Sequence, residues 1–358
     1  MKTKFRNMLE WIKREKNYIN YLLFPLAIIY RLIVFWRNVL YNYSFFISRK
    51  LPAKVISIGN ITTGGTGKTP AVIFLTKHFL QKKQKVAILS RGYGRKTAGT
   101  QEVSNGKAIK GDWLNFGDEP CLMAKKLPGV PIVVDENRYR GGLYITEKFR
   151  PDIIILDDAF QHRALERDID IVLINGQDKK SNHKMFPYGL LREPVKNLKR
   201  ADFIFLSKVN LNKPSPYLIE LTKKVDIPIF NSSFKYNKLT SHNSTQLKKN
   251  HELKVLALSG IADTVGFHRM IKQQKNLRLV KTFSYPDHHE YCQSDIEKIN
   301  NELQGNDIDI VVTTEKDMVK IEKLKISNIE IFSLVANFEL LEEHSFFKLL
   351  DEKLINQS

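Results

Sequence analysis

The chain has 358 residues, enough for two domains with hydrophobic cores, and 57 Lys+Arg against 38 Asp+Glu give it a formal charge of +19. This charge suits an anionic partner such as nucleic acid, a phospholipid surface or a phosphorylated substrate, without choosing among them. The two cysteines, Cys121 and Cys292, exclude a disulfide framework and lack metal-ligand spacing, so we expect a reduced, cytosol-facing chain.

The first segment, 1–45, is predicted to be helical and to lie on a membrane surface. Apolar residues recur at helical spacing among basic residues over 5–16, which is typical of a basic amphipathic helix. An uncharged run follows over 17–30, broken by Pro25, and a second apolar cluster lies beyond Arg31. The fourteen residues of that run are fewer than the roughly 20 that span a bilayer. Aromatic and basic flanks favour the headgroup region. The alternative is a helical hairpin packed on the protein itself.

The sequence Thr-Thr-Gly-Gly-Thr-Gly-Lys-Thr at 62–69 lies between a strand-like run, 54–58, and a helical pattern. Such a loop can curl its backbone N–H groups around phosphate oxygens at a helix N-terminus. Lys68 would reach the β- and γ-phosphates, and the Thr69 hydroxyl would bind Mg²⁺. Thr62 stands where the usual motif begins with glycine, so a turn that binds nothing is the alternative. The residues predicted to bind nucleotide are Thr63, Gly64, Gly65, Thr66, Gly67, Lys68 and Thr69.

Beyond this loop, apolar strand-like runs alternate with helical patterns, which predicts a mainly parallel α/β sheet of the phosphate-loop NTPase type over 46–235. A polar stretch, 236–254, is predicted to be a linker or exposed loop. Alternation then resumes, which predicts a second, smaller α/β domain over 255–358, ending in a helix-like segment at 338–354. The strand-like runs are 85–90, 130–134, 152–156, 169–174, 203–206, 255–258, 279–283, 308–313 and 329–334, and helical patterns include 119–126 and 138–149.

Two carboxylates, Asp157 and Asp158, follow the apolar strand 153–156. At a strand end beside the phosphate loop, one could hold Mg²⁺ or its water while the other orients a ligand, and the sequence does not assign the two roles. A turn with an Asx cap is the alternative.

Asp118 and His288 are candidates for proton transfer. Asp118 opens a helix after Gly117, where it could cap the helix, act as a base or hold a metal-bound water. His288 follows Asp287, which could fix the imidazole tautomer so that the ring accepts a proton from a hydroxyl nucleophile. Exposed loop histidines are the alternative, and a metal site is disfavoured because no third ligand has suitable spacing.

Arginines in glycine-containing loops are candidates for phosphate contacts. Arg91 and Arg95 follow a strand, and Arg192 follows a Gly-containing turn. A guanidinium fork suits phosphate oxygens, although a solvated loop explains these positions equally well.

Together these motifs resemble the tetraacyldisaccharide 4'-kinase family, the lipid A 4'-kinases of Gram-negative bacteria. The matches are ordered and span most of the chain. They are Gly59-Asn60, Gly64–Pro70, Arg91–Arg95, Gly117–Pro120, Leu156-Asp157-Asp158, Phe160-Gln161-His162, Leu191–Pro194, Ser259–Ala262, Asp287-His288-His289 and Thr314–Asp317.

The resemblance implies transfer of the γ-phosphoryl of ATP to the 4'-hydroxyl of a tetraacylated glucosamine disaccharide 1-phosphate in lipid A biosynthesis. It implies a peripheral or monotopic enzyme on the cytoplasmic face of the inner membrane, with the active site in the cleft between two α/β domains. ATP and Mg²⁺ are the implied cofactors. The implied roles are catalysis by Asp118, His288 and Lys68, metal binding by Thr69, Asp157 and Asp158, and substrate binding by Asn60, Arg91, Arg95 and Arg192.

The same loop also resembles that of partition and assembly ATPases, which are dimeric switches, some with membrane-targeting helices. Those proteins carry a lysine where Thr63 stands here, and the Asp287–His288 loop of a second domain argues against this alternative. Nucleic-acid binding rests on the charge alone, since no zinc-finger spacing, RNP-like aromatic motif or clear helix-turn-helix accompanies it, and no nucleic-acid partner is expected.

Overall fold

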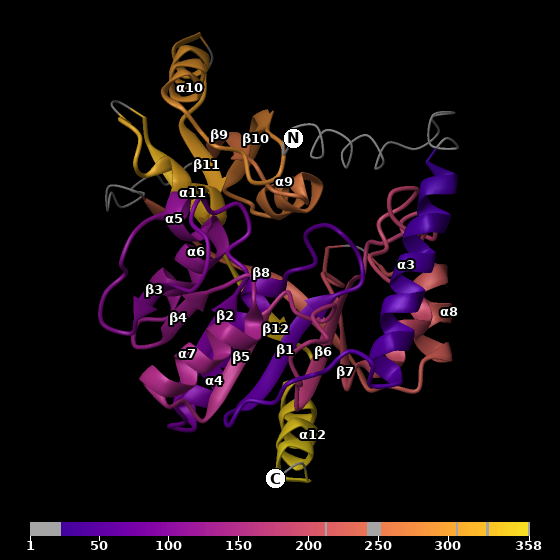
Figure 1. The fold of residues 1–358 in the computed structure, drawn as a ribbon. Helices are drawn as coiled ribbons and strands as arrows, with labels where there is room; N and C mark the ends of the chain where they lie inside the picture. The colour runs from indigo at the N-terminus through magenta and orange to yellow at the C-terminus, as the bar shows by residue number, and fades with distance from the viewer. Residues whose placement is uncertain (1–22, 212, 242–251, 306, 327–328, 357–358) are drawn as a thin grey trace.

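The fold is described from a computed structural model for residues 23–211, 213–241, 252–305, 307–326 and 329–356 (Figure 1). The amphipathic helix predicted over 5–16 lies outside these residues. One twelve-stranded sheet runs through the whole described chain. In sheet order the first eight strands are β3 (Gln101–Asn105), β4 (Pro131–Val134), β2 (Val86–Ser90), β5 (Ile153–Asp157), β1 (Lys54–Asn60), β6 (Ile169–Asn175), β7 (Phe203–Ser207) and β8 (Ile229–Ser241). The order continues with β12 (Ile331–Leu340), β11 (Ile310–Thr314), β9 (Leu253–Ser259) and β10 (Leu277–Ser284).

Neighbouring strands are parallel except where β3 meets β4 and where β8 meets β12. The prediction of a mainly parallel α/β sheet is therefore confirmed. The central strands are apolar on both faces because helices cover both. Ile56 and Ile155 pack on one face with Val72 of α4 (Lys68–Gln81), whereas Val55 and Ile154 pack on the other face with α7 (Arg138–Phe149).

The long strand β8 joins the two halves of the sheet. Its first residues pair with β7, and the rest, 232–241, pairs antiparallel with β12. The prediction of a linker over 236–254 is therefore wrong at both ends, because 236–241 belongs to β8 and β9 begins at Leu253. The polar sequence of 236–241 suggested a loop because these side chains are largely exposed. The segment is nevertheless a strand, since its backbone pairs with β12.

The antiparallel pairing of β8 with β12 also sets the direction of the second half. Strands β9 and β11 run parallel to β12, toward the first half of the sheet. The carboxyl ends of these strands therefore face the carboxyl ends of β1, β2 and β5 (Figure 1). Loops after parallel strands form ligand sites at such edges, so this arrangement brings two sets of them together.

The remaining helices connect or cover the strands. They are α5 (Trp113–Phe116), α6 (Asp118–Lys126), the 3₁₀ helix η1 (Val195–Arg200), α8 (Pro216–Lys224), α9 (Thr264–Lys272), α10 (Gln293–Gly305), α11 (Glu315–Ile321) and α12 (Glu343–Asn356). The helix expected from residue 338 starts later, because 338–340 is the end of β12.

The N-terminal apolar segment forms one continuous helix, α3 (Phe24–Asn42), along one side of the sheet (indigo in Figure 1). Pro25 does not break it, since proline is tolerated in the first helical turn. Its 19 residues make it long and apolar enough to cross a membrane by length and composition, which the count of uncharged residues alone did not predict.

One face of α3 is docked on the protein. Arg37 forms an ion pair with the buried Glu193 (2.8 Å), and Asn38 donates to the same carboxylate (3.2 Å). The Tyr30 hydroxyl donates to the carbonyl oxygen of Arg192 (3.0 Å). The opposite face presents large apolar side chains to solvent, with Ile33 at 61% and Trp36 at 60% exposure. Such a face needs a covering that the described chain does not supply.

Candidate active site

The phosphate loop connects β1 to α4. Gly67 caps α4 in the left-handed region (φ 92°), and a Cβ at this position would lie 2.6 Å from the Phe234 ring on β8. Asn60, the last residue of β1, supports the loop because its side-chain amide donates to the Thr66 hydroxyl (3.1 Å). Lys208, directly after β7, donates to the carbonyl oxygen of Gly65 (2.6 Å). The loop is thus held from three strands, with the N-terminus of α4 behind it.

Asp157 and Asp158 lie at the end of β5 but have different environments. Asp157 is buried, and one of its oxygens accepts from the Ser90 hydroxyl (2.9 Å) while Oδ1 has no partner in the described residues. Burial, with the charges of Glu119 and Asp158, raises the pKa of Asp157 to about 7.

Asp158 has a left-handed backbone (φ 51°) and faces two cations. Both its oxygens accept from Arg192 Nη1 (2.8 and 2.9 Å), and Lys68 Nζ lies 3.6 Å away. Burial opposes the ionisation of Asp158, but Arg192 and Lys68 outweigh it and hold its pKa well below the usual range. Of the two carboxylates, Asp157 has the unused oxygen.

Asp118 and His288 are in direct contact across the two facing edges of the sheet. Asp118 is the first residue of α6, and His288 lies in the loop after β10 in the left-handed region (φ 59°). His288 Nδ1 is 2.9 Å from Asp118 Oδ2. Burial opposes the ionisation of Asp118, but the charge of Lys316 and the hydrogen bond from His288 outweigh it, so its pKa is far below the usual value.

Lys316, in the first turn of α11, assigns the tautomer of His288. Its Nζ lies 3.3 Å from His288 Nε2 and 3.0 Å from Glu119 Oε1. Burial opposes the charge of Lys316, but Asp118 and Asp287 raise its pKa well above the usual value. A charged lysine can only donate, so Nε2 is the accepting nitrogen and Nδ1–H donates to Asp118.

The four predicted substrate contacts divide into two groups. Asn60 is fully buried, and Arg95 is bonded to Glu136 and to the carbonyl oxygen of Gly99, so both have partners inside the protein. Arg91 is exposed and makes no hydrogen bond or ion pair within the described chain, and Arg192 sits on Asp158 at the edge of the site.

The chain is similar to known proteins along most of its length. A family described as tetraacyldisaccharide-1-P 4'-kinase matches residues 19–355. The chain belongs to this family. It is 38% identical over 313 residues to a protein named tetraacyldisaccharide 4'-kinase from Halothermothrix orenii, with 82% of this chain and 81% of that protein covered. It is 36% identical over 330 residues to one of the same name from Aquifex aeolicus, with 92% and 97% covered.

A solved structure of the same family supports the fold. The crystal structure of LpxK from Aquifex aeolicus in complex with ATP has a TM-score of 0.75 and 35% identity, and covers 94% of this chain and 99% of that chain. The family match spans both halves of the sheet, so the partition-ATPase alternative has no support left.

Three residues of this kinase site were not among the predicted site residues. Ser90 donates to Asp157, Lys208 holds the phosphate loop, and Lys316 contacts His288. Ser90 ends β2, Lys208 directly follows β7, and Lys316 lies two residues after the end of β11. In a parallel sheet these are the positions that face a ligand, so the strand ends themselves were the signal.

The side chains at the end of β5 and the start of α4 offer a small set of oxygen ligands for a metal ion. No cluster of three or more His, Cys, Asp or Glu side chains in the described chain has an arrangement that could hold a metal ion. Mg²⁺ in phosphate-transfer enzymes takes only one or two protein carboxylates and completes its shell with phosphate oxygens and water. Asp157 at the end of β5, whose Oδ1 has no partner in the described residues, and Thr69 in the first turn of α4 are groups that fit this donor set.

Proposed function

We propose that this chain transfers the γ-phosphoryl group of ATP to the 4'-hydroxyl of a tetraacylated glucosamine disaccharide 1-phosphate. The observation that carries the proposal is the contact between Asp118 and His288, made from the edge that faces the phosphate loop. An ATPase switch also needs a nucleotide site. A histidine oriented by a carboxylate is needed in addition when an alcohol acceptor has to lose its proton.

In the proposed reaction the 4'-oxygen forms a bond to the γ-phosphorus, and the bond from that phosphorus to the bridging oxygen of ADP breaks. The acceptor hydroxyl loses its proton to the lone pair on His288 Nε2. Asp118 holds the opposite ring nitrogen and stabilises the imidazolium that results. Lys316 has to yield its place at Nε2 to the hydroxyl, and it keeps Glu119 and Asp287 as partners when it does so.

Lys68 and the backbone N–H groups of the phosphate loop would bind the phosphates of the donor. Thr69 and Asp157 would hold Mg²⁺, which supplies neutralisation of charge on the transferred group when bound. Both oxygens of Asp158 already accept from Arg192, so we do not assign it to the metal ion. Asp158 would instead orient Lys68, whose Nζ lies 3.6 Å away. Most of the rate enhancement in phosphoryl transfer comes from such positioning and charge neutralisation.

The acceptor carries acyl chains that stay in a bilayer, so we place the enzyme peripherally on the cytoplasmic face of the inner membrane. The exposed apolar face of α3 supports this placement. Its docked face argues for a helix that lies against the protein over a spanning one, because Arg37 and Asn38 are tied to a buried carboxylate. Arg91 and Arg192 remain the proposed contacts for the acceptor.

The direct test is the reaction itself. The full chain with Mg²⁺, γ-labelled ATP and tetraacyldisaccharide 1-phosphate in detergent micelles should form a labelled lipid whose new phosphate is on the 4'-oxygen. Folded protein that binds ATP but releases only inorganic phosphate, or forms no lipid product, would overturn the proposal.

A further inference from the structure

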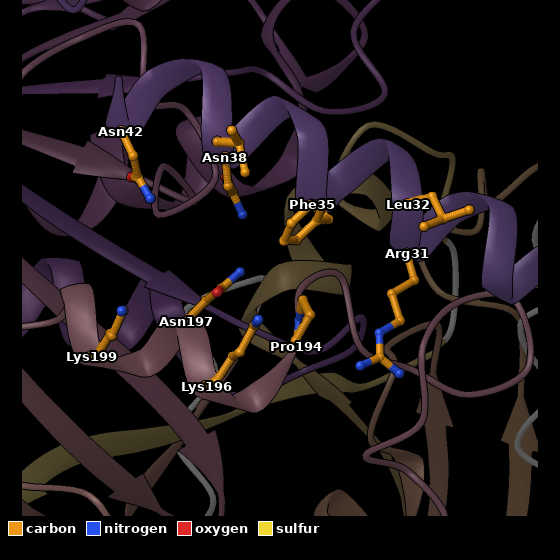
Figure 2. A pocket seen from close by; sticks show the side chains of 10 residues that line it. Arg31, Leu32, Phe35, Asn38, Asn42, Pro194, Lys196, Asn197 and Lys199 are labelled. Atoms are coloured by element: carbon orange, nitrogen blue, oxygen red, sulfur yellow. The ribbon is translucent and has the colours of Figure 1, made fainter. Parts of the chain in front are cut away.

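A cavity of about 370 Å³ lies between α3 and η1 (Figure 2), and neither Asp118 nor His288 lines it. Leu32, Phe35 and Val39 line it from α3, and Pro194 lines it from the segment before η1. Its walls are therefore largely hydrocarbon, and it opens beside the exposed apolar face of α3.

Three cations surround this cavity, and no acidic side chain lines it. Arg31 comes from α3, whereas Lys196 and Lys199 rise from η1 toward α3 (Figure 2). None of the three has an ion pair within the described part of the chain, and Lys196 Nζ lies over the Phe35 ring, 5.7 Å from its centroid. The nearby Arg37 and Arg200, by contrast, are both paired with Glu193. The positive charge at the rim of the cavity is thus left unneutralised.

An apolar cavity with a cationic rim matches one class of ligand, an anionic group carried on the same molecule as a hydrocarbon chain. A free phosphate would leave the apolar wall uncovered, and an uncharged lipid would leave the cations unpaired. We propose that this cavity binds the phosphate headgroup and adjoining acyl segment of an anionic glycerophospholipid from the bilayer, at a site separate from that of the acceptor.

The position of the cavity connects such a lipid to the active site. Two residues that line the cavity, Asn38 and Asn197, donate to the buried Glu193 carboxylate, which also binds Arg37 of α3 and Arg200 of η1. The preceding residue, Arg192, holds Asp158 with its side chain. A lipid seated between α3 and η1 therefore stabilises the same contacts that position Arg192. This binding does not require the proposed kinase reaction, so it can be tested independently.

The test uses the full chain in micelles of an uncharged detergent. Calorimetric titrations compare dihexanoyl phosphatidylglycerol, dihexanoyl phosphatidylcholine and inorganic phosphate, with thermal unfolding as the check on folding. Phosphatidylglycerol should bind about tenfold more tightly than either of the other two probes. The double variant Lys196→Gln/Lys199→Gln should weaken phosphatidylglycerol binding by about tenfold.

A matched control removes two charges elsewhere. Lys107 and Lys348 are exposed and do not line the cavity, so Lys107→Gln/Lys348→Gln should change the affinity by less than about twofold. Val39→Phe keeps the charge but fills the cavity, and it should weaken phosphatidylglycerol binding as well. Val39→Phe therefore still tests the proposal if the double lysine variant fails to fold.

Three outcomes would overturn the proposal. Equal losses in the two lysine variants would mean general attraction to a basic protein. Inorganic phosphate binding as tightly as phosphatidylglycerol, with the same dependence on Lys196 and Lys199, would mean a simple anion site. Displacement of phosphatidylglycerol by tetraacyldisaccharide 1-phosphate in this cavity would mean that the cavity belongs to the acceptor.

Discussion

His288 Nδ1 lies 2.9 Å from Asp118 Oδ2, although 170 positions separate the two residues in the chain. Asp118 belongs to the first half of the sheet and His288 to the second. Their contact exists because the antiparallel pairing of β8 with β12 turns the carboxyl edges of the two halves toward each other. A base oriented by a partner on the opposite half depends on both halves being in place, which links proton transfer to the fold as a whole.

His288→Ala and Asp118→Asn should each lower kcat by about 10²- to 10⁴-fold while leaving ATP affinity nearly unchanged, since neither side chain belongs to the phosphate loop. Because the two act as a unit, the double variant should be no slower than the slower single variant. Steady-state kinetics and equilibrium ATP binding measure the two quantities. His289→Ala is the control, because that imidazole pairs with Asp295 instead. Additive losses, or collapse of ATP binding, would contradict the shared role.

The sequence predicted the local parts of this site but not their geometry. The phosphate loop and the Asp157–Asp158 strand end are short patterns whose chemistry follows from residue type and position. The roles of Lys316 and Lys208 depend on contacts across the sheet that local sequence cannot specify. The second half of β8 was missed for a related reason, because its pairing with β12 is a long-range backbone contact and its exposed side chains are polar.

Gly67→Ala should impair nucleotide binding for two reasons that can be separated. The left-handed backbone at Gly67 costs about 1–2 kcal/mol for any residue with a Cβ, and that Cβ would overlap the Phe234 ring. Adding Phe234→Leu should relieve the overlap and restore part of the ATP affinity measured by calorimetry, with the backbone cost remaining. Gly64→Ala offers a comparison, since it has a positive φ with open space around it. Full rescue by Phe234→Leu would argue against backbone strain.

Glu193→Gln should loosen α3 and slow turnover. The buried Glu193 carboxylate binds Arg37, Asn38, Asn197 and Arg200, and removing one partner of a buried ion pair costs about 3–5 kcal/mol. Hydrogen exchange of α3 amides should accelerate, and kcat should fall because Arg192 is the adjacent residue. Glu220→Gln is the matched control, since its pair with Lys224 is exposed to solvent and an exposed ion pair contributes little to stability. Unchanged hydrogen exchange in α3 would contradict the idea that the Glu193 carboxylate holds this helix in place.

The exposed face of α3 should determine attachment to vesicles but not the chemistry. Replacing Ile29, Ile33 and Trp36 with serine should lower partitioning into phospholipid vesicles by at least about tenfold, because these side chains are more than half exposed and apolar. Activity on an acceptor in detergent micelles should stay close to that of the unchanged chain, since none of the three makes the docked contacts, which come from Tyr30, Arg37 and Asn38. Co-sedimentation with vesicles measures attachment. Unaltered sedimentation would place membrane binding elsewhere.

Glu102 on β3 should make stability depend on pH in the acid range. Burial opposes its ionisation, but hydrogen bonds from Lys110, Lys148 and Tyr144 outweigh it and lower its pKa from 4.5 to about 2. A carboxylate with a lowered folded-state pKa stabilises the protein above its unfolded-state pKa, and this contribution is lost as the pH falls from about 4.5 toward 2. Glu102→Gln should therefore lower the free energy of unfolding at pH 7 by about 1–2 kcal/mol after allowance for solvent screening of the lysines. In urea titrations between pH 7 and pH 3 the variant and the unchanged chain should converge as the pH falls. A difference that stays constant over this range would mean that Glu102 acts through packing and not through its charge.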